Sequence, residues 1–161
     1  MRDFNHDELC DFVSLTRDLP VHVRFIEFMP FDGNGWTTRQ LYSYQDMLQS
    51  IRNEFTVEKI ADAQHSTAKK YQVPGFTGTF AFITTMSEVF CGDCNRLRLT
   101  ADGKMKNCLF SATETDLLSA LRNGEDIRPL ICACIADKKA SMGGQTNPME
   151  MINRSMIQIG G

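Results

Sequence analysis

The sequence lacks any long apolar run and has little excess of positive charge. None of its 161 residues lies in an uninterrupted stretch of 18 or more apolar side chains, which excludes a transmembrane helix. The first eight residues are too polar for a signal peptide, so we expect no secretory leader. With 17 Lys and Arg against 20 Asp and Glu, no global basic field is available for a nucleic-acid backbone. We therefore expect an intracellular protein that binds neither membranes nor nucleic acids.

The composition is that of an ordinary globular protein, with 42% hydrophobic and 23% charged residues. The chain shows no internal repeat and no low-complexity tract. Its length is sufficient for one domain, or for one small domain and part of another.

The first thirty residues predict a helix followed by a buried strand. Asn5 is a candidate N-cap, and Glu8 lies three residues on, as in a capping box. Pro20 ends that segment, and the apolar, β-branched run Val21–Met29 follows it. This order predicts part of an α/β unit whose strand is buried on both faces. The Gly- and Asn-rich loop 31–36 then marks a domain boundary.

The remainder of the chain predicts a mixed α+β domain. A helix is expected to begin at Ser43, with Asp46 at its third position and a stripe of apolar side chains after it. Strands are expected over 70–73, 77–85, 96–100 and 104–110, and helices over 113–122 and 126–139. The segment 142–153 reads as irregular.

Three of the six cysteines, Cys91, Cys94 and Cys108, form the most informative motif. A CxxC pair brings two thiolates close enough to bind one metal centre, and the third cysteine lies in the following hairpin. Structural zinc takes four protein ligands, for which His65 is the plausible distant donor here. Iron–sulfur clusters are also held by cysteine thiolates, and three ligands on a four-iron cubane would leave one iron open. The spacing alone leaves zinc and cluster as alternatives.

The other three cysteines are expected to be core or near-core residues. Cys132 and Cys134 are two positions apart on a predicted helix, so they point to different faces and cannot easily share a metal. Cys10 stands alone on the first helix.

Two arginines follow the cysteine pair directly. Arg96 and Arg98 alternate with Leu97 and Leu99, which is typical of a strand with one polar and one apolar face. The planar guanidinium suits phosphate oxygens and stays charged at any relevant pH. The alternative is that both arginines are simply solvated surface residues.

The turn after this strand decides which side chains share a face with Cys108. A two-residue turn at Asp102-Gly103 would place Cys108 opposite Leu97. A three-residue loop, with Gly103 in the left-handed region, would place Cys108 opposite Arg96. We predict the three-residue loop, a type I turn followed by a glycine bulge.

Three stretches of the sequence are distinctive as whole motifs. They are FCGDCNRLRLTADGKMKNCL at 90–109, VRFIEFMP at 23–30 followed by GNGW at 33–36, and RSMIQIGG at 154–161. Together these motifs resemble the C-terminal half of the GTP 3',8-cyclase family, the radical S-adenosylmethionine enzymes of molybdenum cofactor biosynthesis. The resemblance covers nearly the whole chain.

The resemblance implies a set of functional residues. The three clustered cysteines would hold a 4Fe-4S cluster whose open iron binds GTP, and Arg96, Leu97 and Arg98 would contact that substrate. Met29, at the end of the strand, would line the S-adenosylmethionine site. The catalytic residues would be Gly160 and Gly161, because their lack of side chains lets the backbone enter a narrow active site.

The family's architecture also sets expectations for this chain. Residues 1–30 would be the terminal βα elements of an incomplete TIM-type barrel. Residues 31–161 would be a C-terminal α+β domain with a small antiparallel sheet. Members act in the cytoplasm of bacteria or in the mitochondrial matrix of eukaryotes.

One departure from the family limits the expected activity. No CxxxCxxC motif occurs in the sequence, so the cluster that generates the radical has no ligands here. We therefore expect the chain to be inactive by itself, and to form a homodimer or pair with a full-length chain that covers its exposed strand edge. The alternatives are a non-catalytic module that binds a cluster and a nucleotide, a structural zinc protein, and a ubiquitin-like sulfur carrier.

Overall fold

The computed structural model describes residues 1–159 and divides them into two compact units. Unit 1 comprises Met1–Met29 and Thr37–Phe90, and unit 2 comprises Pro30–Trp36 together with the chain from Cys91 onward. The chain thus leaves unit 1 after Met29 and returns to it at Thr37. The assignment of residues 1–30 and 31–161 to separate domains stays a prediction.

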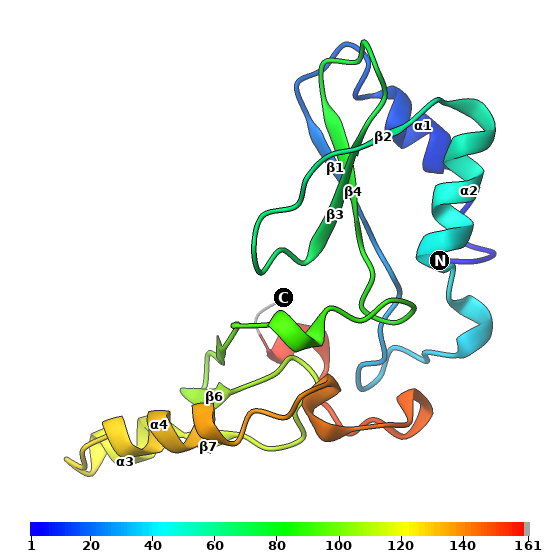
Figure 1. Cartoon of the computed structure of the whole chain (residues 1–161). Helices are drawn as coiled ribbons and strands as arrows, with labels where there is room; N and C mark the ends of the chain where they lie inside the picture. The colour runs from blue at the N-terminus through cyan, green and yellow to red at the C-terminus, as the bar shows by residue number, and fades with distance from the viewer. Residues whose placement is uncertain (160–161) are drawn as a thin grey trace. The chain divides into compact units, whose positions relative to one another are not determined.

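Unit 1 is built on a four-stranded mixed sheet with the order β1-β4-β3-β2. The first pair is parallel, with His22 opposite Thr79, and the other two pairs are antiparallel. Figure 1 shows β1, β4 and β3 side by side. The strands are β1 (His22–Ile26), β2 (Glu58–Lys59), β3 (Ala68–Gln72) and β4 (Thr79–Ile83).

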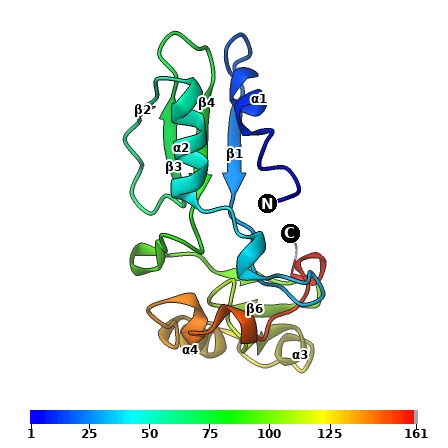
Figure 2. The same cartoon turned by 90° about the vertical axis from the view of Figure 1, so that its right-hand side faces the viewer.

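Two helices cover one face of this sheet, α1 (Leu9–Ser14) and α2 (Tyr44–Glu54), as Figure 2 shows. The predicted start of α2 is confirmed, since Ser43 and Asp46 form a capping box. The predicted cap of α1 is wrong. Glu8 occupies the N-cap position without a side-chain hydrogen bond, and the Asn5 side chain accepts from the terminal amine of Met1 instead.

The core of unit 1 lies between the helices and the sheet and is rich in aromatic rings. Phe80 and Phe82 of β4 are fully buried, and their rings meet edge to face at 5.7 Å between centroids. Tyr71 stacks on Phe80 at 5.8 Å. The helices contribute aliphatic side chains from positions three and four apart, which share one face of a helix: Leu9, Val13, Met47, Leu48 and Ile51.

The prediction that the first strand is buried on both faces is wrong. Only Phe25 of β1 is buried, whereas Ile26 is 54% exposed. The physical reason is that the helices cover just one face of the sheet and that β1 is an edge strand. An edge strand with exposed apolar side chains is a template for further pairing.

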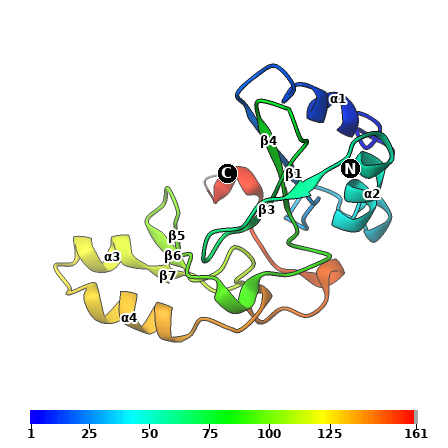
Figure 3. The same ribbon diagram turned by 45° about the horizontal axis from the view of Figure 1, so that its top comes forward.

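Unit 2 combines a three-stranded antiparallel sheet with two short helices that lie side by side in Figure 3. Its hydrophobic cluster is small, with Met105, Leu117 and Cys134 buried at its centre. The strands are β5 (Arg98–Leu99), β6 (Lys104–Lys106) and β7 (Thr115–Asp116). The helices are α3 (Leu117–Arg122) and α4 (Arg128–Ala136).

Several predicted elements are shorter in the structure. The strand expected over 104–110 ends at Lys106, and the helix expected from residue 113 begins only at Leu117. Residues 115–116 pair with β6 instead, and the Asp116 carboxylate then caps α3 by accepting from Ser119 N at 3.0 Å. One-turn 3-10 helices occupy Thr38–Gln40, Cys91–Asp93, Met142–Gly144, Pro148–Glu150 and Met156–Gln158.

The fold class of the described residues is therefore mixed α/β with two small open sheets. Neither sheet closes into a barrel in this part of the chain. The small antiparallel sheet expected in the later half is confirmed by β5, β6 and β7.

Candidate functional site

The hairpin of β5 and β6 carries the predicted site, and its turn has the predicted form. Gly103 N donates to Thr100 O at 2.9 Å, and Gly103 has a left-handed φ of 76°. Thr100 N donates to Lys104 O at 2.9 Å, which closes a three-residue loop with a glycine bulge. Arg98 lies opposite Lys106. The ladder ends there, so the pairing of Arg96 with Cys108 stays a prediction.

The candidate metal ligands lie at the open end of this hairpin. Cys91 and Cys94 are joined by a one-turn hydrogen bond from Cys94 N to Cys91 O of 3.1 Å, and Cys108 follows β6 by two residues. All three thiols are half-buried and free of disulfides. Within residues 1–159, however, no three His, Cys, Asp or Glu side chains stand close enough to hold a metal ion. His65, the candidate fourth zinc ligand, belongs to unit 1.

The remaining cysteines divide between core and surface. Cys134 is buried and Cys132 is exposed, so the two do face different ways on α4. The expectation that Cys132 is a core or near-core residue is wrong, because α4 buries only one face against β6 and β7. Cys10 is half-buried on α1.

The arginine strand has the reverse of the usual burial pattern. Leu97 and Leu99 are 44% and 67% exposed, whereas Arg98 is half-buried and donates from Nη1 to Ile159 O at 3.2 Å. Directly opposite residues of an antiparallel pair share one face, so Arg98 lies on the same face as Lys106. The terminal segment covers this polar face, and Arg96 is exposed.

Lys106 is a buried cation that sequence reasoning missed. Its side chain is 1% exposed, and its ammonium donates to Asn153 Oδ1 at 2.7 Å. Glu114 Oε1 lies 3.9 Å away. Burial lowers the pKa of Lys106 from its usual value, and the nearby Glu114 carboxylate opposes that shift. The available signal was the register, which places this lysine opposite Arg98.

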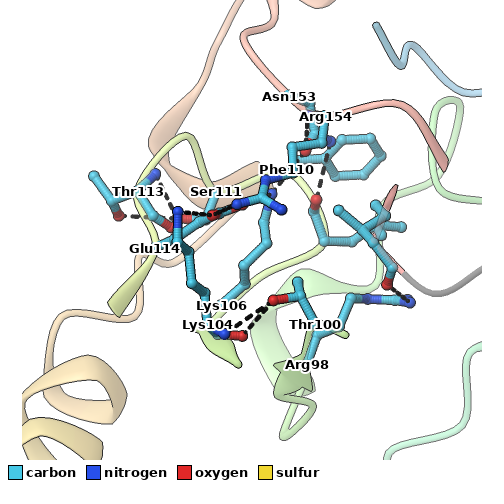
Figure 4. A network of polar contacts seen from close by, with 12 residues as sticks. Arg98, Thr100, Lys104, Lys106, Phe110, Ser111, Thr113, Glu114, Asn153 and Arg154 are labelled. Atoms are coloured by element: carbon cyan, nitrogen blue, oxygen red, sulfur yellow. Dashed lines mark hydrogen bonds and ion pairs between the residues drawn. The ribbon is translucent and has the colours of Figure 1, made fainter. Parts of the chain in front are cut away.

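Arg154 forms the other half of the same network (Figure 4). Its Nη1 donates to Asp102 Oδ2 at 2.9 Å, and its Nη2 donates to Glu114 Oε2. These contacts raise the pKa of Arg154. Hydrogen bonds from the Thr100 hydroxyl and then from Arg154 lower the pKa of Asp102. A cavity of about 340 Å³ lies beside the network and is lined by Asp32, Lys106, Ser111, Glu114, Asn153 and Arg154, among others.

Lys138, which follows α4, joins the two strand ends nearest the cysteines. Its ammonium donates to Arg96 O at 2.8 Å and also to Asn107 O. The Asn107 side chain in turn donates to Cys134 O at 2.9 Å. These bonds fix the backbone immediately before Cys108 against α4.

A second buried charge, Glu27, organises the loop that precedes the cysteine pair. The Glu27 side chain is 2% exposed and accepts from Met86 N at 2.7 Å and from Ser87 N at 2.9 Å. It also accepts from Tyr44 N at 2.8 Å, at the start of α2. A carboxylate can be buried in this way because backbone N–H donors replace its water. The glutamate within an apolar strand was the signal for this role.

Two further predicted positions complete the candidate site. Met29 is half-buried and lies three residues beyond β1, at the end of the first segment of unit 1. Gly160 and Gly161, the predicted catalytic residues, lie outside the described residues.

The fold and the site define an α+β protein whose hairpin presents cysteines beside a set of buried and half-buried cations. The chain belongs to the Molybdenum Cofactor Synthesis C family, whose model matches residues 21–143. This agrees with the resemblance to the C-terminal half of the GTP 3',8-cyclases.

Named relatives come from animals, plants and bacteria. The chain is 50% identical over 164 residues to mouse "Molybdenum cofactor biosynthesis protein 1", with 99% of this chain and 26% of the mouse protein covered. It is 46% identical to "GTP 3',8-cyclase, mitochondrial" of Arabidopsis thaliana, covering all of this chain and 42% of the relative. It is 41% identical to "GTP 3',8-cyclase" of Alkaliphilus oremlandii, covering 98% of this chain and 49% of the relative. The chain thus spans about a quarter to a half of the length of these relatives. None of the described helices is long and apolar enough to cross a membrane.

Proposed function

We propose that this chain is the cluster-bearing, GTP-binding part of a GTP 3',8-cyclase. That enzyme converts GTP into (8S)-3',8-cyclo-7,8-dihydroguanosine 5'-triphosphate in molybdenum cofactor biosynthesis. The observation that carries the proposal is the hairpin that follows the cysteine pair and sets Arg98 opposite Lys106, within a chain that is 46% identical to a plant protein of that name.

Cys91, Cys94 and Cys108 are the proposed ligands of a 4Fe-4S cluster. Three free, half-buried thiols are a suitable donor set, because thiolates are the ligands these clusters take. The three thiols are not gathered into a metal site in the described residues, so cluster binding would draw the Cys91–Cys94 turn towards Cys108. When bound, such a cluster supplies an iron with an open coordination position for a nitrogen or oxygen atom of GTP.

The strand that follows the cysteine pair is the proposed contact for GTP. Arg96 is exposed beside the cysteine turn, where its guanidinium can meet phosphate oxygens in a bidentate manner. Arg98 keeps donors beyond the one that it gives to Ile159 O. Leu97, 44% exposed between them, offers an apolar surface to the nucleotide.

The remaining assignments concern the parts that meet the rest of the enzyme. We propose that β1 is the last strand of a radical S-adenosylmethionine barrel and that its edge pairs with the preceding strand or with another chain, in a homodimer or a full-length partner. Met29 would then line the S-adenosylmethionine site. Gly160 and Gly161 would enter the active site as bare backbone. The compartment would be the cytoplasm in bacteria or the mitochondrial matrix in eukaryotes, and the Arabidopsis relative is named mitochondrial.

Anaerobic reconstitution with iron and sulfide tests the cluster assignment. We expect the wild-type chain to take up about four iron atoms, as a cubane requires, and Cys108→Ala to take up far less. Cys132→Ala is the matched control, because this cysteine is exposed on α4. Bound zinc with no iron uptake would favour a structural zinc protein, and equal loss in the control would remove the specific assignment.

A second experiment tests whether the chain is catalytic by itself. With S-adenosylmethionine and dithionite, the reconstituted chain should release no deoxyadenosine, because the sequence lacks the CxxxCxxC motif. Appreciable release would contradict the assignment of this chain to the substrate-binding part alone.

A further inference from the structure

The last described residues are attached to the hairpin by polar contacts at three separate points. Asn153 makes the first, since its Nδ2 donates to Leu109 O at 3.0 Å while its Oδ1 accepts from Lys106 at 2.7 Å. Leu109 directly follows Cys108. Asn153 therefore joins a buried cation on β6 to the backbone beside a proposed cluster ligand.

Arg154 makes the second attachment and reaches both ends of the sheet. One nitrogen bonds Glu114 next to β7 (Figure 4), and the other bonds Asp102 in the hairpin turn. The Glu114 side chain is 13% exposed and also lies 3.9 Å from the Lys106 ammonium. Glu114 Oε2 also lies 4.0 Å from the Lys104 ammonium, so this one carboxylate serves three cations.

Arg98 makes the third attachment at the end of the segment. It donates to the carbonyl of Ile159, whose own side chain is fully buried. Between the second and third attachments, the chain forms a single turn closed by Gln158 N to Ser155 O at 3.0 Å and by Ile159 N to Met156 O at 3.2 Å. The residue before Gly160 is consequently fixed in place.

Stability alone does not account for the buried part of this network, Lys106 with Glu114. A buried ion pair often stabilises a fold less than apolar side chains of similar volume would, because both charges lose water. What charged hydrogen bonds add is a defined orientation. A terminal segment that served only to cover β6 could have packed on it with apolar side chains.

We infer that Lys106 and Arg154 are positioning residues that lock the terminal segment onto the cysteine hairpin, so that the chain beyond Ile159 starts from a fixed point at Arg98. Lys106 acts through Asn153, and Arg154 acts through Asp102 and Glu114. The inference rests on the proposed function, which gives the fixed point its purpose. Under that proposal, the backbone after Ile159 and the arginine strand contact the same GTP.

Hydrogen exchange on the full chain tests the lock itself. Exchange at Gln158 and Ile159 should become about tenfold faster or more in Arg154→Gln and in Lys106→Met, because each loses charged hydrogen bonds. Arg154→Lys should be intermediate, since it keeps the charge but cannot bond both carboxylates. Arg128→Gln is the matched control, because it breaks an exposed pair with Asp126 and should leave these amides unchanged. Unchanged exchange in both Arg154→Gln and Lys106→Met would overturn the lock.

GTP binding by the same reconstituted variants tests its purpose. Where a variant keeps the thermal unfolding midpoint of the wild-type chain, its GTP affinity reports positioning and not unfolding. We expect Arg154→Gln to bind GTP about tenfold more weakly and Arg154→Lys to recover part of the loss. Faster exchange with unchanged GTP affinity would overturn the positioning role and leave the proposed function intact. A wild-type chain that takes up the cluster but does not bind GTP would overturn the proposed function, and hydrogen exchange alone would then decide whether the lock exists.

Discussion

Each of the two units is stabilised internally by a different kind of interaction. Unit 1 has an apolar cluster of eleven buried residues that includes five stacked or edge-on aromatic rings, whereas the cluster of unit 2 has three buried members. Unit 2 instead relies on hydrogen bonds and ion pairs around Lys106, Glu114 and Arg154. A small apolar core stabilises a domain only weakly, and such domains commonly depend on a metal or another covalent constraint. This difference is expected if unit 2 binds a cluster, as proposed.

Replacing Phe80 by Ala should have the largest effect and should be confined to unit 1. The ring is fully buried among Tyr71, Phe25 and Phe82, so its loss leaves a cavity that costs about 3–5 kcal/mol. Trp36, the single tryptophan of the sequence, lies buried in unit 2 and reports that unit by its fluorescence. In urea unfolding, Phe80→Ala should lower the midpoint of the circular dichroism transition of unit 1 and leave the midpoint of the tryptophan fluorescence transition unchanged. A common shift of both transitions would mean that the units unfold as one.

Replacing Glu27 by Gln should have the next largest effect. The change removes the charge that accepts from three backbone N–H groups, and a hydrogen bond to a charged group contributes about 1.5–3 kcal/mol. Hydrogen exchange should quicken at Met86 and Ser87, because the loop before Cys91 loses its anchor. The exposed Glu58→Gln serves as a control and should leave these amides unchanged. If Glu27→Gln leaves them equally protected, the carboxylate does not hold the loop.

Replacing Gly103 by Ala tests the hairpin of unit 2. Gly103 has a φ of 76°, and an added Cβ would overlap the Leu118 side chain, so we expect a loss of about 1–3 kcal/mol. Gly124→Ala is the matched control, because its φ is 77° but its Cβ would meet no atom within 4 Å. The urea midpoint of the tryptophan fluorescence transition should therefore fall further for Gly103→Ala than for Gly124→Ala. Equal losses would show that backbone conformation alone, without the contact to Leu118, sets the cost.

The smallest expected effect is a pH dependence through Asp102. The Thr100 hydroxyl and the Arg154 guanidinium hold the pKa of Asp102 below its usual value of about 3.9. A folded pKa that is depressed contributes stability above the unfolded pKa, and this contribution is lost as the pH falls through the folded pKa. The free energy of unfolding of wild type minus Asp102→Asn should thus be largest near neutral pH and shrink below about pH 4. A difference that stays constant between about pH 6 and pH 2.5 would contradict this titration.

Local sequence signals predicted the parts of the fold that depend on neighbouring residues. The Ser43 cap and the glycine bulge at Gly103 are both set by the chemistry of a few adjacent side chains, and both are confirmed. The cap expected at Asn5 was wrong because the terminal amine of Met1 competes for the same side chain. Strand lengths were overestimated where the ladder stops for lack of a partner, as it does after Lys106.

The polar face of the hairpin could not be predicted from alternation. The pattern of Leu97 and Leu99 between arginines indicates that the leucines are inside, but the terminal segment covers the arginine side instead. That outcome depends on contacts more than forty residues apart, such as Lys106 to Asn153 and Arg154 to Asp102. Only the register of the turn connects Lys106 to Arg98, and it becomes informative once the turn type is known.

The most direct test of the account is the electron paramagnetic resonance spectrum of the reduced, reconstituted chain with and without GTP. If Cys91, Cys94 and Cys108 hold a cubane with an iron open to GTP, the nucleotide should change the spectrum of the wild-type chain and of Cys132→Ala alike. Arg96→Gln should require a higher GTP concentration for the same change. A cubane signal that GTP leaves unaltered at saturating concentration would contradict the claim that this chain binds its substrate at the cluster.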